Sequence, residues 1–209
     1  MTDAEHTPRR HRKGLAREQE ILRVATDHFA TSGFRGASLR EIAAACGIAH
    51  SSLLRYFPSK EALLVAVLER WDRTEASDFY VPEDRSGPQI LSGLVALAEQ
   101  NANARGVVDL TTTLGAEAVD PDHPAHAYVT DRLERMRLVV ADALRRAEAA
   151  GELRADVDIA DAAAGIVALV EGVPLQWLYA PSTIDMAGAL ATMIQALLLV
   201  PLPEWRPRD

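Results

Sequence analysis

The sequence predicts an all-α protein of about nine helices, with a small three-helix N-terminal domain and a larger helical C-terminal domain. Alanine, leucine, glutamate and arginine dominate the composition, aromatic residues make up only 5%, and alternating β-branched runs are scarce. Apolar residues instead recur at the spacing of helical faces. At 209 residues the chain can form two helical domains. We expect an arm over 1–14, the N-terminal domain over 15–60 and the C-terminal domain over 61–209.

The charges are divided unevenly between these parts. Residues 1–60 contain ten Lys and Arg against six Asp and Glu, whereas the rest of the chain contains 12 basic and 24 acidic residues. A basic segment can approach a polyanion that repels the acidic remainder, so nucleic acid is expected to meet only the N-terminal part. A solvated polar surface is the alternative interpretation of the same charges.

Residues 1–14 are polar and include a run of basic side chains from Arg9 to Lys13, which predicts a mobile basic arm. It either reaches DNA or is a tail without a role. The segment lacks the apolar stretch of a secretory signal, and no run approaches the roughly 20 apolar residues of a membrane span. The single Cys46 excludes an intrachain disulfide and is expected to be a small core residue rather than a redox sensor. We therefore expect a cytoplasmic protein without a membrane contact.

The first helix is predicted from about Arg17 to Ser32, with Gly33 as its stop. The second begins at Ser38, which forms a capping-box pattern with Glu41. A short third helix follows Gly47 and extends to about residue 57, and a fourth begins after 58–59 and continues beyond residue 71. Further helices are predicted at about 89–103, 106–118, 124–150, 159–179 and 184–200, with a loop over 78–88.

The last two predicted helices are apolar nearly all round, which is unfavourable for a face exposed to water. Small residues such as Ala164, Ala168 and Gly172 would allow a second copy of the chain to approach closely. We therefore expect a homodimer through these helices, with a fully buried intramolecular pair as the alternative. Pro174 removes a backbone donor there, and the resulting kink would shape a pocket or fit the dimer.

The spacing of Ala43, Gly47, Ile48 and Leu53 fits a helix-turn-helix motif over about 38–57. Such a motif needs a small residue where its helices cross, a glycine at the turn, and apolar residues where the second helix docks. The stretch from Gly33 to Ala43, with Gly47 and then 53–63, closely resembles the signature of the TetR family of transcriptional regulators. The segments 151–158 and 172–181 also resemble a common C-terminal type of that family.

This resemblance implies double-stranded DNA as a partner and assigns candidate contacts. The second helix of the motif would enter the major groove, and Ser38, Tyr56 and Lys60 would contact phosphate. The full candidate set is Ser38, Arg40, His50, Ser51, Ser52, Leu54, Arg55, Tyr56 and Lys60. The alternatives are that Ser38 only caps a helix, that Tyr56 only packs, and that Arg55 is a solvated surface side chain. Ala49 and Leu54 depart from the family pattern, which usually has a Ser or Thr cap and often a Tyr there.

The resemblance also implies a small-molecule effector inside the C-terminal helices. Large or adaptable side chains with a few polar ones are candidates for its wall, although ordinary core packing is the favoured interpretation of each apolar one. The candidates are Trp71, Asn101, Leu110, Thr111, Leu114, Tyr128, Met136, Glu171 and Trp177, with Phe79 as a further one. The expected function is a repressor released from a palindromic operator by a small, largely apolar effector. An activator or ligand-independent regulator is the alternative, and a helical protein-interaction dimer is a remote one.

Nothing in the sequence predicts an enzyme, because it has no glycine-rich phosphate loop, no nucleophile elbow and no assembled Ser/His/Asp set. His123 and His126 have a spacing that can bind a metal from one helix face. Without further obvious ligands, a polar helix start is the expected interpretation. We predict no metal and no cofactor.

Overall fold

The computed structural model describes residues 7–75 and 84–205, which form nine α-helices and no strand. The all-helical prediction is therefore confirmed. The contacts between residues divide the chain into two compact units, Met1–Arg70 and Trp71–Asp209, called here unit 1 and unit 2. This division lies ten residues beyond the boundary expected at residue 60, because the first part of the fourth helix belongs to unit 1.

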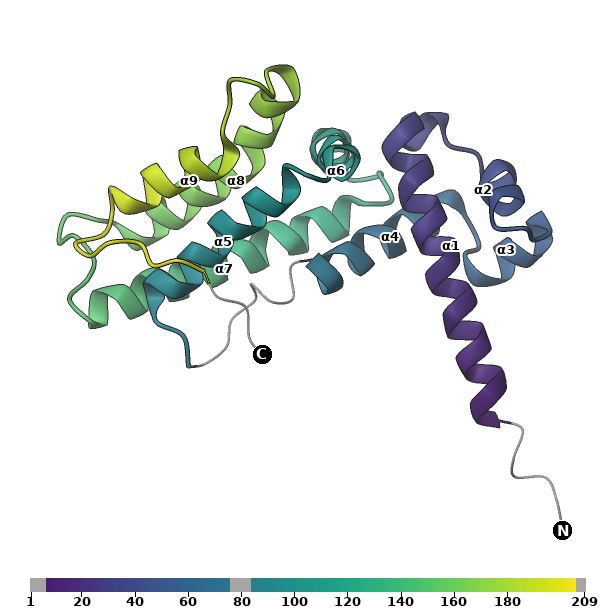
Figure 1. The fold of residues 1–209 in the computed structure, drawn as a ribbon, viewed down its shortest axis with the longest axis horizontal. Coiled ribbons are helices and arrows are strands. Elements are labelled where there is room, and N and C mark those ends of the chain that lie inside the picture. The colour runs from purple at the N-terminus through teal and green to yellow at the C-terminus, as the bar shows by residue number, and fades with distance from the viewer. Residues whose placement is uncertain (1–6, 76–83, 206–209) are drawn as a thin grey trace, which may run out of the picture. The chain divides into compact units, whose positions relative to one another are not determined.

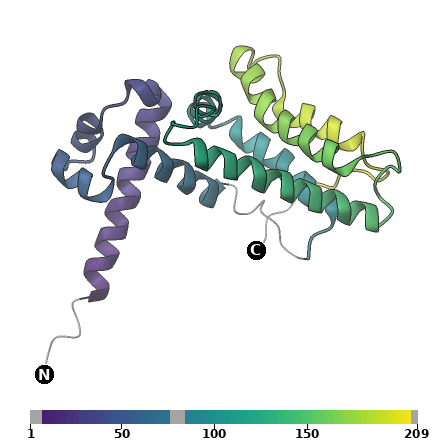
Figure 2. The same cartoon turned by 180° about the vertical axis from the view of Figure 1, so that it is seen from behind.

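Unit 1 contains α1 (Thr7–Gly36), α2 (Leu39–Ala45), α3 (His50–Tyr56) and most of α4 (Lys60–Glu75). In Figures 1 and 2, α2 and α3 lie side by side along one side of α1. Each helix contributes fully buried side chains to a common core, which holds the short α2 and α3 in place. The largest of them are Ile21, Leu22, Phe29, Ile42, Leu53, Leu63 and Leu64.

The start of α1 differs from the prediction of an arm over residues 1–14, because the helix already begins at Thr7. Pro8 is compatible with this start, since the first turn of a helix needs no backbone donor from it. The arginines and lysine that follow are good helix formers, and no breaker interrupts them before Gly14. Residues 1–6 lie outside the described residues. At the other end, Gly33 has φ 68°, a backbone conformation that stops the regular helix as expected.

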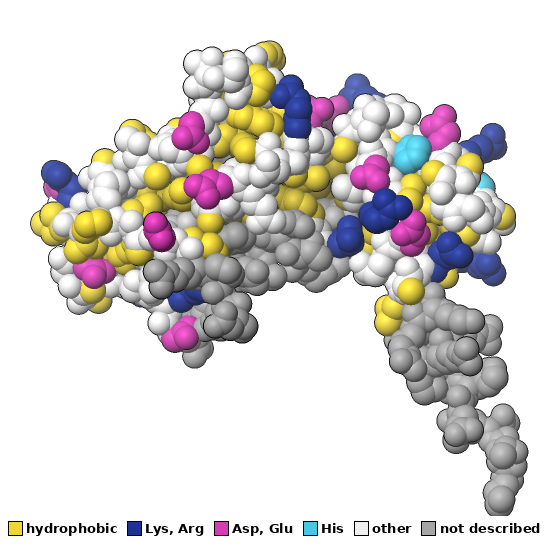
Figure 3. Space-filling model, viewed as in Figure 1, with side chains coloured by type: hydrophobic (Ala, Val, Ile, Leu, Met, Phe, Trp, Pro, Cys, Tyr) yellow, Lys and Arg dark blue, Asp and Glu magenta, His cyan; other side chains and the backbone are white. Residues whose placement is uncertain are grey.

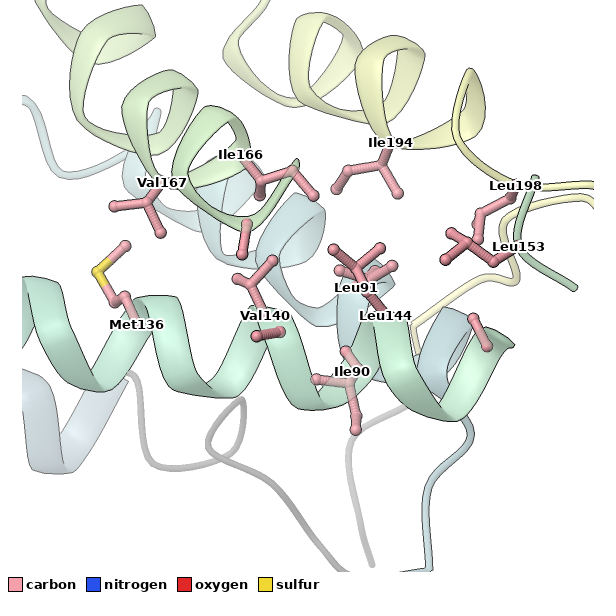
Figure 4. Close-up of a cluster of buried hydrophobic side chains, with 14 of the residues drawn as sticks. Ile90, Leu91, Met136, Val140, Leu144, Leu153, Ile166, Val167, Ile194 and Leu198 are labelled. Carbon is pink, nitrogen blue, oxygen red and sulfur yellow. The ribbon is translucent and has the colours of Figure 1, made fainter. Parts of the chain in front are cut away.

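Unit 2 contains α5 (Gly87–Asn101), α6 (Arg105–Glu117), α7 (His126–Ala149), α8 (Ile159–Tyr179) and α9 (Met186–Gln195). Helix α7 packs against α5 and α8, and α9 packs against α5 and α8. These four helices form two layers (Figure 1), and α6 lies against α8 and α5. Figure 4 shows the core between the layers, where Val140 and Leu144 of α7 face Ile166 of α8 and Ile194 of α9.

The last helix was predicted to extend to residue 200, and this was wrong, because α9 ends at Gln195. The backbone beyond it pairs instead with the segment before α8. Arg154 N–H donates to Leu197 C=O at 3.0 Å, and Leu199 N–H donates to Glu152 C=O at 2.7 Å. Buried Leu153 and Leu198 form the isolated antiparallel bridge between these bonds. Leu198 is therefore buried by a bridge rather than by a helical face, whereas Leu199 is exposed.

The predicted capping box at α2 is also wrong. The Ser38 hydroxyl accepts a hydrogen bond from Arg40 N–H at 3.3 Å, one residue earlier than the bond from Glu41 that a capping box requires. A complete capping box is present at α5 instead. There Ser86 Oγ accepts from Gln89 N–H at 3.4 Å, and Gln89 Oε1 accepts from Ser86 N–H at 2.9 Å.

Helix α8 continues through Pro174 to Tyr179 and is unusual for its exposed apolar surface. By length and composition alone it is apolar enough to cross a membrane, yet only 22% of its most apolar window is buried in the chain. A helix that packs against a second subunit has the same properties. Leu175 is 46% exposed and Tyr179 is 85% exposed. Among the described residues, part of this helix therefore has no apolar cover, although its composition predicts one.

Candidate functional site

The first candidate site is the turn between α2 and α3 together with the outer side of α3. Gly47 has φ 63°, and the N–H groups of Gly47 and Ile48 donate to Ala44 C=O and Ala43 C=O, each at 3.0 Å. These bonds close α2 and reverse the chain within a few residues. Leu53 is fully buried and fixes α3 on the core. The motif of α2, turn and α3 thus has the geometry expected of a helix-turn-helix.

The side chains proposed to contact DNA lie on this motif and around it. Arg40, Ser51, Arg55 and Tyr56 are exposed. The other five candidates are half-buried, namely Ser38, His50, Ser52, Leu54 and Lys60. Figure 3 shows Lys and Arg side chains gathered over unit 1, whereas the visible face of unit 2 has broad hydrophobic areas. Arg40 and Arg55 outnumber Glu41 on the motif, and its surface also offers hydroxyl and imidazole groups for hydrogen bonds.

Two of these candidates make contacts within the protein that hold their side chains in place without DNA. Arg55 Nη2 donates to Ser52 Oγ at 3.1 Å, one helical turn away, which limits the positions of the guanidinium group. Lys60 Nζ donates to Arg35 C=O at 3.3 Å and to Ala37 C=O at 3.2 Å, and it lies 4.6 Å from the centre of the Phe34 ring. Lys60 therefore fastens the start of α4 to the end of α1, in addition to the phosphate contact predicted for it.

Helix α3 begins without a side-chain cap. Ala49 occupies the N-cap position and makes no such hydrogen bond, in agreement with the departure noted in the sequence. Beneath the motif, Cys46 is buried, and this burial raises the pKa of its thiol. A raised pKa disfavours the reactive thiolate, which agrees with a core residue rather than a redox sensor.

The second candidate site is a cavity inside unit 2, called here the cavity. Water-sized groups can occupy about 70 Å³ of it. All six helices from α4 to α9 contribute to its wall, which is mostly apolar. The wall consists of Trp71, Leu94, Leu97, Ala98, Asn101, Val108, Thr111, Thr112, Arg132, Met136, Val139, Leu169, Val170, Glu171, Val173, Pro174, Met186 and Leu190.

Five of the nine ligand candidates line this cavity: Trp71, Asn101, Thr111, Met136 and Glu171. The other four lie outside its wall. Leu110 and Leu114 are buried on α6, and Trp177 packs in a cluster with Val108, Val173 and Met186. Tyr128 donates its hydroxyl to Asp72. Phe79 lies outside the described residues.

Sequence reasoning did not identify Arg132, the basic residue of the cavity wall. Its side chain is only 13% exposed, and Nη1 donates to Glu171 Oε1 at 2.7 Å. Its Nε lies 3.5 Å from Asp72 Oδ1, and the guanidinium lies 5.8 Å from the centre of the Trp71 ring. The sequence feature that indicates Arg132 is its position on α7, four residues from each of the candidates Tyr128 and Met136 and thus on the same helix face.

Around Arg132 the charges are balanced. Asp72 is 15% exposed and accepts from the Tyr128 hydroxyl at 2.7 Å, and Arg135 Nη2 lies 3.7 Å from the same carboxylate. Burial by itself lowers the pKa of Arg132, but the charge and hydrogen bond of Glu171 and the charge of Asp72 outweigh it and raise that pKa. Arg132 is therefore a permanent buried cation. We call Asp72, Tyr128, Arg132, Arg135 and Glu171 the Arg132 cluster.

His123 and His126 both make contacts with the backbone. His123 Nδ1 accepts from Ala125 N–H at 3.2 Å, and His126 Nδ1 lies 2.8 Å from Ala118 C=O. These contacts organise the start of α7, as a polar helix start would. Within residues 7–75 and 84–205, no group of three or more potential metal ligands occurs.

Family models match both units. The model of bacterial regulatory proteins of the tetR family matches residues 21–67, and the model of the C-terminal part of BetI-type transcriptional repressors matches residues 93–199. The first covers the helix-turn-helix, and the second covers most of the cavity wall. The two matches agree with the division of the chain into two units.

Individual relatives match over different lengths. RutR, an HTH-type transcriptional regulator of Escherichia coli K12, is 45% identical over 64 residues, 31% of this chain and 30% of RutR. The transcriptional repressor KstR2 of Mycobacterium tuberculosis H37Rv is 26% identical over 151 residues, 69% of this chain and 72% of KstR2. The solved complex of SmeT with triclosan has a TM-score of 0.76 at 21% identity, covers 92% of this chain and 100% of SmeT, and shows a shared fold.

Proposed function

Because the chain belongs to the TetR family of bacterial transcriptional regulators, we propose that it is a repressor that a small, largely apolar ligand releases from a palindromic operator. The observation that carries this proposal is the apolar cavity that reaches the end of α4. This helix belongs to unit 1 as far as Arg70 and contributes Trp71 to the cavity wall. One continuous helix thus joins the DNA-binding motif to the ligand site.

Helix α3 is proposed to recognise bases in the major groove. Exposed Ser51 and Arg55, with half-buried His50 and Ser52, offer hydrogen bonds to base edges, and Leu54 offers an apolar contact to a thymine methyl group. Arg55 is the strongest candidate, because its guanidinium can donate two bonds to one guanine. The hydrogen bond that Arg55 donates to Ser52 reduces the number of positions that Arg55 samples before binding.

The phosphate contacts are proposed to come from residues beside α3. Ser38 lies at the start of α2, exposed Arg40 follows in its first turn, and Tyr56 and Lys60 flank the end of α3. Contacts of this kind set the position of the protein on the duplex without recognising its sequence. Their loss is expected to weaken binding to all DNA sequences alike.

A palindromic operator requires two copies of the motif, and we propose that α8 and α9 form the homodimer. Exposed Ala164, Gly165 and Ala168 allow another helix to approach closely, and the larger Leu175 continues the same apolar face. On α9, Met193 is 48% exposed and Leu199, beyond its end, is 64% exposed. A symmetric pairing would cover these surfaces with themselves.

The ligand releases the protein from its operator if it binds more tightly to the arrangement that cannot bind DNA. Typical couplings of about 1 to 3 kcal/mol would weaken operator binding roughly 5- to 150-fold. The ligand would act through the cavity wall on the end of α4. This assignment makes the protein a cytoplasmic regulator rather than an enzyme.

The experiment that tests DNA recognition is selection of bound fragments from genomic DNA, followed by titration against salt. A regulator retains a palindromic site at a salt concentration that abolishes binding to random sequence, because non-specific attraction falls steeply with salt. If selected and random fragments are lost together, a merely basic helical dimer that binds protein becomes the better interpretation.

The repressor and ligand parts need a second measurement, namely transcription from the selected promoter in vitro with and without candidate compounds. Repression relieved by a compound that also raises the melting temperature of the protein supports the whole proposal. Activation, or repression that no compound relieves, would leave the DNA-binding regulator and overturn the ligand-released repressor.

A further inference from the structure

We propose that the ligand of the cavity carries a carboxylate on an apolar body, and that this carboxylate pairs with Arg132 in place of Glu171. The inference rests on the proposed ligand-released regulator and names the chemical class of its ligand. Its basis is that, within the Arg132 cluster, the carboxylate of Asp72 has more partners than the carboxylate of Glu171.

The carboxylate of Asp72 is held firmly. Its side chain is 15% exposed, Oδ2 accepts the Tyr128 hydroxyl at 2.7 Å, and Arg135 adds a second positive charge at 3.7 Å. Its Oδ1 is buried 3.5 Å from Arg132 Nε and has no hydrogen-bond partner among the described residues. Asp72 is thus a fixed counter-charge that makes only a long contact with the guanidinium.

The carboxylate of Glu171 is held by Arg132 alone among the described contacts. Its side chain is 33% exposed, more than twice as much as that of Asp72. Glu171 lies on the cavity wall, and its flexible side chain can turn toward solvent at small cost. The exchangeable partner of the buried cation is therefore an anion that is already located inside the ligand site.

The sign of the ligand's charge follows from the cost of leaving Arg132 unpaired. A cationic ligand that captured Glu171 would leave the guanidinium with only the 3.5 Å contact to Asp72, and breaking a buried pair on one side is strongly destabilising. A neutral apolar ligand would leave the existing pair untouched and gain nothing from it. A carboxylate replaces Glu171 with the same geometry, because the guanidinium fork matches a carboxylate.

The rest of the wall defines the remainder of the ligand. Leu94, Leu97, Met136, Leu169 and Leu190 present apolar surface from four helices. Such a wall favours a hydrocarbon or ring system over a second charged group. The ligand class is an amphipathic monocarboxylic acid.

The test compares three probes with the same chain but different head groups: decanoate, decanol and decylamine, each used below its micelle concentration. Binding to the intact protein is measured by isothermal titration calorimetry and by tryptophan fluorescence, to which Trp71 on the wall contributes. We expect decanoate to bind at least about tenfold more tightly than either other probe, because only decanoate can form a two-bond fork with Arg132 in exchange for the single described bond to Glu171. Equal or tighter binding of decanol or decylamine overturns the proposal.

The variant Glu171→Gln tests the exchange itself while keeping the shape of the side chain. It removes the competing carboxylate, so decanoate affinity should rise by about tenfold, whereas decanol affinity should stay the same. Glu134→Gln is the matched control, because Glu134 is an exposed carboxylate of α7 that pairs with Arg137. Arg132→Lys keeps the buried charge but loses the fork, and decanoate affinity should fall. Unchanged decanoate affinity in both Glu171→Gln and Arg132→Lys overturns the proposal.

Operator release by the same probes separates this inference from the proposed function. If decanol or decylamine binds best and releases the operator, the ligand-released regulator stands and the carboxylate class is wrong. If decanoate binds through Arg132 but does not change operator affinity, the ligand class stands and the switch is wrong.

Discussion

The two candidate sites differ in how their polar groups are stabilised, by water on α3 and by internal ion pairs in the cavity. The surface of α3 in unit 1 must stay hydrated and polar until DNA arrives, so its groups are exposed or half-buried and make few internal bonds beyond the Arg55 to Ser52 contact. The cavity of unit 2 is buried in apolar surroundings, so its one basic residue, Arg132, must be neutralised by internal carboxylates. The difference teaches where each kind of mutation acts. Changes of exposed α3 side chains such as Arg55 should alter recognition with little effect on folding, whereas changes around the cavity should alter stability and ligand response together.

The largest expected effect concerns the proposed homodimer, which would bring two copies of unit 1 onto one operator. Leu175→Glu places a carboxylate in the proposed α8 interface, where an unpaired buried ion costs on the order of several kcal/mol. We expect the dimer to become a monomer in analytical ultracentrifugation and operator affinity to collapse. Leu138→Glu is the matched control, because Leu138 on α7 is 56% exposed and Leu175 is 46% exposed. If both variants remain dimeric, α8 is not the interface.

The next effect tests whether the two units respond separately. Leu53 of α3 is fully buried, and Leu53→Ala should lower the free energy of unfolding of unit 1 by about 2 to 5 kcal/mol. Urea denaturation measures this loss, and operator binding should be lost with it because α3 is no longer fixed. Ligand binding in unit 2 should remain. The neighbouring Leu54→Ala is a control with a smaller loss, since Leu54 is only half-buried. Loss of ligand binding in Leu53→Ala would contradict the separation of the units.

A glycine pair tests the packing of unit 2. At Gly87 a Cβ atom would overlap the Ala143 carbonyl oxygen and crowd Ala147 N at 2.7 Å, both of them backbone atoms that cannot easily move. Gly87→Ala should therefore destabilise unit 2 by about 1 to 3 kcal/mol, as overpacking does. Gly115→Ala on α6 meets nothing within 4 Å and should stabilise by up to about 1 kcal/mol through helix propensity. Thermal unfolding of both variants measures the difference, and equal shifts would show that α5 does not pack so closely on α7.

An effect of similar size concerns the DNA contacts of unit 1. Arg55→Ala should lose about 1 to 3 kcal/mol of discrimination at one base pair, whereas Lys60→Ala should weaken binding to all sequences and lower the salt slope by roughly one. Lys60→Ala should also lower stability, because its ammonium group bonds two backbone carbonyls. Arg137→Ala is the control, since it removes an exposed cation of unit 2 that pairs with Glu134. Titrations that neither Arg55→Ala nor Lys60→Ala changes would refute the assigned surface.

Prediction from the sequence succeeded where the determinants are local. The small, glycine and apolar positions of the motif, Ala43, Gly47 and Leu53, lie within eleven consecutive residues, so their spacing alone predicts the turn. The cavity depends on six helices separated along the chain, and the sequence identified only some of its wall. Arg132 was missed because an arginine on an amphipathic helix is normally solvated, and only the tertiary positions of Asp72 and Glu171 make a buried one stable. The end of α9 was misplaced for the same reason, since Leu198, beyond the helix, pairs with the distant Leu153.

The smallest expected effect compares the helix starts of the two units. Ser86 forms a complete capping box at α5, and Ser86→Ala should cost about 1 kcal/mol of the stability of unit 2 because it leaves the Gln89 N–H without its acceptor. Ser38 forms only a 3.3 Å bond to Arg40 N–H, outside a capping box, so Ser38→Ala should cost less in stability. Its proposed phosphate contact nevertheless predicts a loss of operator affinity that Ser86→Ala does not share. Urea denaturation and operator titration of both variants separate the two roles. A Ser38→Ala variant that loses stability but keeps its DNA affinity would show that Ser38 is only a cap.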